Sequence, residues 1–87
     1  MAPSYLHMRV LNFRAQKFAI GKKVVAVQQY ISGNIFIDIG EVGEIVGEAY
    51  HDLPDLNMFN IRVIDIDFGL QKISLGEAVA EMFVEPL

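Results

Sequence analysis

Hydrophobic and polar positions alternate with a period of two through much of the 87-residue chain, a pattern typical of β-strands. The strongest run extends from Phe59 to Phe68, where Ile64, Ile66 and Phe68 alternate with two aspartates before a glycine. Similar alternation, or an unbroken β-branched run, predicts further short strands at residues 24–30, 35–39, 44–50, 70–74 and 82–84.

Turn residues and one helix signal separate these predicted strands. Ser32-Gly33-Asn34 predicts a tight turn, and residues 51–57, with their proline, aspartates and asparagine, predict an exposed loop. Ser74 and Glu77 have the spacing of a capping box, which predicts one or two helical turns through Glu81 before a last strand. Five or six short strands with little helix indicate a mainly β domain, built as a small barrel or sandwich.

The amino-terminal segment allows two interpretations. Its alternation of apolar and polar residues starts at Leu6 and slips by one position after Val10, which favours a strand with a bulge or bend. Leu6, Val10 and Phe13 also fall on one helical face, so a helix is the alternative. We interpret residues 1–17 as a basic arm or extra strand, and residues 18–87 as the folded domain.

The glycine spacing adds a resemblance. Gly21 precedes the Val24–Val27 strand, Gly40-x-x-Gly43-x-Ile45-Val46 follows, and a later strand ends in Phe68-Gly69 before a one-turn helix and a last strand. This order, over roughly Phe18 to Val84, resembles SH3-like barrels such as KOW-type domains and the small barrel subunits of cofactor enzymes. The resemblance implies an SH3-like barrel of five to six short strands with one short C-terminal helical turn.

The chain departs from two branches of this family. KOW-type domains bind RNA through basic loops, whereas this chain is strongly acidic after Lys23. Signalling SH3 domains hold proline-rich peptides in a groove that includes a tryptophan, and this chain has no tryptophan. The type that remains is a small accessory barrel that docks on a larger protein.

The formal net charge of −4 is divided unevenly along the chain. Residues 1–23 contain five basic residues and no acid, giving +5, whereas residues 24–87 contain eleven acids against Arg62 and Lys72, giving −9. A basic stretch interleaved with aromatic residues is compatible with contact to nucleic acid or an acidic membrane. We favour pairing of the basic arm with the acidic remainder, within the chain or between copies, and do not expect nucleic acid as a partner.

Side chains that carry catalysis are scarce. The chain has no cysteine or threonine, three serines and two histidines, and it has neither a Gly-x-Ser-x-Gly frame nor a glycine-rich phosphate loop. His51, Asp52, Asp55 and Asn57 lie close together in sequence but match no metal-ligand spacing. We therefore expect a protein that is not an enzyme and has no cofactor and no metal site.

Composition also bears on location and partners. The lack of cysteine fits a reducing compartment, and the longest uncharged run, residues 24–37, is too short and too polar to span a bilayer. These features predict a cytoplasmic protein with no membrane attachment. A mean hydropathy of +0.35 in so small a domain leaves large apolar side chains outside unless a partner covers them, although strands rich in Val and Ile also raise this value.

Together these features predict a non-catalytic protein-binding module that acts as an accessory subunit, regulator or inhibitor of a larger protein. One alternative is a structural component of a homo- or hetero-oligomeric assembly, for example a viral one, and another is a nucleic-acid-associated KOW-like domain. The predicted partner-binding residues lie in the amino-terminal arm and around the 51–57 loop: Tyr5, Leu6, Met8, Arg9, Phe13, Arg14, Leu53, Leu56, Met58 and Phe59.

Overall fold

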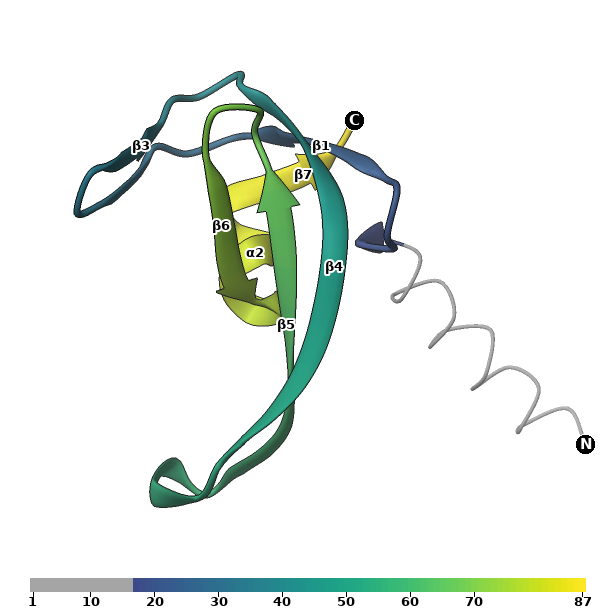
Figure 1. Cartoon of the computed structure of the whole chain (residues 1–87), viewed down its shortest axis with the longest axis vertical. Coiled ribbons are helices and arrows are strands. Elements are labelled where there is room, and N and C mark those ends of the chain that lie inside the picture. The colour runs from purple at the N-terminus through teal and green to yellow at the C-terminus, as the bar shows by residue number, and fades with distance from the viewer. Residues whose placement is uncertain (1–16) are drawn as a thin grey trace, which may run out of the picture.

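The computed structural model describes residues 17–87, which form seven strands, one α-helix and a short 3₁₀ turn (Figure 1). In chain order these are β1 (Lys23–Ala26), β2 (Tyr30–Ser32), β3 (Ile35–Ile37), β4 (Val42–Leu53), η1 (Pro54–Leu56), β5 (Met58–Asp67), β6 (Lys72–Gly76), α2 (Glu77–Phe83) and β7 (Val84–Pro86). The predicted mainly β class with one short C-terminal helix is confirmed. The predicted amino-terminal strand, and the helix that was its alternative, lie outside the described residues.

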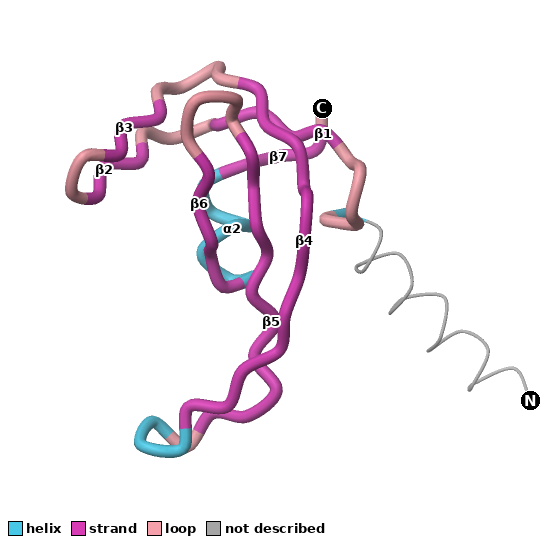
Figure 2. The backbone as a smooth tube through the Cα atoms, viewed as in Figure 1, coloured by secondary structure: helices cyan, strands magenta, loops and turns pink. Residues whose placement is uncertain are grey.

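Five of the strands form one antiparallel sheet in the order β6-β5-β4-β1-β7, and β2 and β3 form a separate hairpin (Figure 2). Figure 1 shows β7 crossing behind β5 and β6 at a steep angle, with α2 beside it. Over the described residues the two edge strands, β6 and β7, are not bonded to each other. Strands that cross steeply cannot share a hydrogen-bond ladder, so the expected closed barrel is corrected to an open sheet that bends around its core.

The core fills the concave side of this bent sheet. Its twelve buried apolar residues come from the segment before β1 and from most of the elements: Phe18, Val24, Ala26, Ile37, Ile45, Ile64, Ile66, Ile73, Leu75, Ala80, Phe83 and Val84. Phe83 of α2 packs against the rings of Tyr30 and Phe68, with centroids 5.4 and 6.0 Å away. The helix and the β2–β3 hairpin thus complete the core that the sheet begins.

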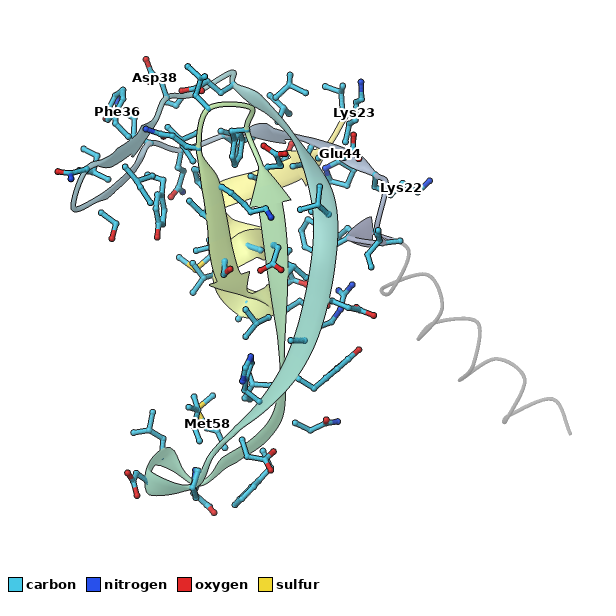
Figure 3. The ribbon with its side chains drawn as sticks, viewed as in Figure 1. Lys22, Lys23, Phe36, Asp38, Glu44 and Met58 are labelled. Carbon is cyan, nitrogen blue, oxygen red and sulfur yellow. The ribbon has the colours of Figure 1, made fainter. Side chains whose placement is uncertain are left out.

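The β2–β3 hairpin and the turn after it are held by local hydrogen bonds. Gly33 takes a positive φ of 58° in the hairpin turn, which confirms the predicted turn. The Asp38 carboxylate accepts hydrogen bonds from the Gln29 side chain at 3.1 Å and from the Ile39 backbone at 2.8 Å. Figure 3 shows Asp38 beside Phe36 at this end of the molecule. These bonds hold Asp38 and Ile39 in the turn between β3 and β4.

The predicted capping box is wrong. Ser74 lies inside β6, directly opposite Asp65 of β5, and its hydroxyl donates to the Asp65 carboxylate at 2.5 Å. The helix begins instead after Gly76, which has no side chain to cap it. The Ser74 hydroxyl bonds to Asp65 across the sheet and is not available to cap the helix, so strand pairing overrides the local capping motif. The helix has seven residues, and no helix within residues 17–87 has the length and apolar character that crossing a membrane requires.

Three predicted boundaries are also corrected. The predicted strand at 24–30 breaks after β1, because the chain leaves the sheet there to enter the β2–β3 hairpin. The strand predicted to start at residue 44 starts earlier, because β4 begins at Val42 and Gly43 lies within it, paired with Val24. The predicted loop at 51–57 is shorter than expected, since β4 continues to Leu53 and only residues 54–57 form the turn before β5 starts at Met58. Backbone pairing between two distant segments decides these boundaries, and local turn residues do not reveal it.

Candidate functional site

The outer part of the β4–β5 hairpin, residues 48–62, projects from the body as a two-stranded ribbon that we call the hairpin arm (Figure 1). β6 pairs with β5 only over Val63–Asp67, and backbone bonds from the β1 side reach β4 only as far as Ile45. Within the described part of the chain, no third strand accompanies the ribbon beyond these points. Both of its outer edges therefore present unpaired backbone groups, which is the usual template for strand addition.

The tip of the arm has a defined conformation. Asn57 and Asn60 take positive φ values of 53° and 56°, which asparagine tolerates better than most side chains. The Asn57 N–H donates to the Pro54 carbonyl at 3.0 Å, and the Asn60 N–H donates to the Asp52 carboxylate at 2.8 Å. The tip is thus an ordered turn that presents its side chains in fixed directions.

The side chains of the arm are apolar but uncovered. Every residue from Tyr50 to Asn60 is exposed, and five of them are large and apolar: Tyr50, Leu53, Leu56, Met58 and Phe59. Leu56 and Phe59 leave 67% and 59% of their surface open. Figure 3 shows Met58 near the tip, far from the body of the sheet. A two-stranded ribbon is marginally stable by itself, and exposed apolar clusters of this kind are typical of contact surfaces.

The acidic charge of the arm limits which surfaces are complementary to it. Glu48, Asp52 and Asp55 lie on it, and residues 48–61 contain no lysine or arginine. Lys22 and Lys23 lie at the far end of β4, beside Glu44 (Figure 3). The surface complementary to the arm is therefore apolar and basic, and two arms would repel each other.

Arg62 joins the base of the arm to two other parts of the fold. Its Nε donates to Glu48 at 2.7 Å, one terminal nitrogen donates to Glu77 at 2.7 Å, and the other donates to the Phe18 carbonyl at 2.8 Å. Burial of the guanidinium acts to lower the pKa of Arg62, but its hydrogen bonds and ion pairs with the two glutamates outweigh this and raise the pKa above its ordinary value. Arg62 therefore stays charged and holds β4, α2 and the segment before β1 together.

An open groove of about 840 Å³ lies beside this cluster. Its walls are the inner face of the arm, the start of α2 and the two residues that follow Phe18. The apolar part of the lining comes from Ile20, Tyr50, Met58, Ile61 and Val79. Arg62, Glu48 and Glu77, which we call the Arg62 cluster, lie at the base of the groove. An apolar groove with a few charged groups at its base is typical of a binding site for a peptide segment.

Replacing Arg62 with methionine is expected to lower the free energy of unfolding by about 1–2 kcal/mol. The change leaves Glu48 and Glu77 without their shared cation and the Phe18 carbonyl without its donor. The expected loss of stability is small because both glutamate side chains are more than a third exposed, so water screens the ion pairs. Urea denaturation measures the loss.

The exposed Lys72→Met variant is the control, because it also removes one positive charge, and it should change stability by no more than about 0.5 kcal/mol. Equal effects of the two variants would show that the Arg62 cluster adds nothing to the fold.

The structure places the predicted binding residues in two groups. Leu53, Leu56, Met58 and Phe59 all lie exposed on the hairpin arm, where Leu53 and Met58 are register partners. The other six lie outside the described residues: Tyr5, Leu6, Met8, Arg9, Phe13 and Arg14. No group of three or more histidine or acidic side chains within residues 17–87 has a metal-binding arrangement.

Sequence reasoning missed the residues at the base of the arm, Arg62, Glu48 and Glu77. A signal for them was present, because Arg62 is the only basic residue between positions 24 and 71, among many acids. A lone cation in such a stretch is expected to be shared by carboxylates. Comparison of the chain with family models, curated proteins and solved structures found no match.

Proposed function

We propose that this chain is a non-catalytic protein-binding module that docks on a larger protein through the hairpin arm, as an accessory subunit, regulator or inhibitor. The observation that carries this proposal is the run of exposed residues from Tyr50 to Asn60, which holds five large apolar side chains on an ordered ribbon. A short isolated ribbon gains little by displaying such side chains to water, whereas burying them against a partner would stabilise the complex.

The arm offers two means of contact. Its free edges can add to a sheet of the partner, with backbone hydrogen bonds providing affinity. Tyr50 and Phe59 then act as anchors, because aromatic side chains are frequent among the residues that dominate binding energy. The acidic groups of the arm select a partner whose surface is basic around an apolar centre.

We also propose that the strands have an SH3-like arrangement. The order of strands, with a separate hairpin after β1 and a short helix before the last strand, supports an SH3-like arrangement.

A structural assembly of identical copies is the second candidate. The observation in its favour is the position of Lys22 and Lys23 at the end of β4 opposite the acidic arm (Figure 3). A head-to-tail contact would bring the arm of one copy to these lysines of the next. Nucleic acid is not favoured, since residues 17–87 contain eleven acids against five basic residues.

The test compares two double variants with the unchanged chain in affinity capture from the native source. Leu56→Ser with Phe59→Ser removes apolar groups from the arm, and Ile31→Ser with Phe36→Ser removes similar exposed groups from the β2–β3 hairpin. We expect the arm variant to bind its partner at least about 30-fold more weakly, because loss of an anchor costs about 2 kcal/mol or more.

The hairpin variant should bind as the unchanged chain does, and both variants should melt near its temperature. A partner retained equally by all three chains would rule out the arm. Sedimentation of the purified chain identifies the second candidate, which requires oligomers that dissociate as salt increases.

A further inference from the structure

The groove beside the Arg62 cluster lies next to the point where the described chain begins. Ala19 and Ile20 form one of its walls, and Phe18 just before them is fully buried. The Phe18 carbonyl is held by Arg62 at 2.8 Å. These contacts anchor the chain at the rim of the groove, so residues 1–16 are tethered there.

The sequence of residues 1–16 complements this groove. The segment contains Arg9 and Arg14 and no acidic residue. It also carries a set of large apolar side chains: Tyr5, Leu6, Met8, Val10, Leu11 and Phe13. The groove lining is mostly apolar, and its charged groups are Glu48 and Glu77 against Arg62, a net charge of −1. Both glutamates pair with the arginine and each is more than a third exposed. A basic apolar segment thus meets an acidic apolar groove.

We propose that residues 1–16 bind in this groove of their own chain. Sixteen residues span up to about 50 Å when extended and about 24 Å as a helix, so either conformation reaches along the groove from its rim. Tethering by a short connection gives an effective concentration in the millimolar range, far above that of a second copy. The arm of a second copy is a poor occupant, because it carries the same acidic charge as the groove.

This intramolecular contact has a consequence for the arm. Tyr50 and Met58 line the groove, whereas Leu53, Leu56 and Phe59 do not. A bound amino-terminal segment would cover the inner face of the arm and leave its tip open. An external protein that contacts the inner face would have to displace residues 1–16, whereas one that contacts the tip would not.

The absence of cysteine makes a direct test possible, because a single introduced cysteine can carry a nitroxide label. We choose Met8→Cys in the full chain and measure loss of methyl NMR signals relative to the reduced, diamagnetic label. Signals of Ile20, Ile61 and Val79 in the groove should be lost. Signals of Ile31 and Ile39, at the β2–β3 end, should persist.

Two controls decide the outcome. Mixing isotope-labelled chain without nitroxide and spin-labelled chain without isotope should restore the groove signals; loss that persists would show contact between copies and overturn the intramolecular proposal. Arg9→Glu with Arg14→Glu should restore them as well, since the segment then repels Glu48 and Glu77. Groove signals that stay intact in the labelled full chain, or are lost no more than those of Ile31 and Ile39, would show that residues 1–16 lie elsewhere. That result would leave partner binding by the arm tip unaffected.

Discussion

Replacing Phe18 with alanine is expected to lower the free energy of unfolding by about 3–5 kcal/mol. Phe18 is fully buried, although it precedes the first strand and is followed by half-buried Ala19 and exposed Ile20. Removing its ring leaves a cavity in a core of twelve residues, which has few neighbours able to move into the space. A domain of this size has a total stability of about 5–15 kcal/mol, so the variant would lose a large part of it.

Matched variants separate burial from the chemistry of the substitution. Phe36→Ala and Phe59→Ala make the same change at side chains that are 47% and 59% exposed. Each should alter the free energy of unfolding by no more than about 0.5 kcal/mol in urea denaturation. If Phe18→Ala proved as mild as these two, the segment before β1 would not be part of the core.

The alternation of residues predicted the central strands because their environment repeats every second position. Ile64 and Ile66 face the core, and Asp65 between them faces outward to Ser74, as the pattern indicates. The same pattern could not show which strands pair or where the sheet ends. The pattern left a barrel and a sandwich both open, and the closed barrel was expected from the resemblance in glycine spacing, whereas the steep crossing of β7 leaves the described sheet open.

The sequence predicted the exposed apolar residues of the candidate site, but it did not predict the residues that are defined by contacts between distant parts of the chain. Leu53, Leu56, Met58 and Phe59 were identified because they stand among turn-forming and polar residues. Arg62 was missed because its three partners lie 14, 15 and 44 positions away in sequence. Only the fold brings such partners together, so the groove and its base follow from tertiary structure.

Gly43 has a packing role, because its lack of a side chain lets Ile66 and Phe68 lie close to the β4 backbone. It lies within β4 opposite Val24, and its φ is not positive, so conformational freedom does not explain it. A Cβ atom built there would lie 2.9 Å from Cγ2 of Ile66 and 2.9 Å from Cε1 of Phe68. Ile66 is fully buried and so has little room to move, and Phe68 is half-buried with its ring packed on Phe83.

Replacing Gly43 with alanine is therefore expected to lower the free energy of unfolding by about 1–3 kcal/mol, the usual cost of an overpacked core. The test combines this change with Phe68→Leu, which removes the ring atoms that the new methyl group would meet. The two changes together should cost less than the sum of their separate costs, by at least about 0.5 kcal/mol in a double-mutant cycle. Additive costs would place the origin of the destabilisation outside this contact, and a neutral Gly43→Ala variant would show that the β4 backbone can move away from β5.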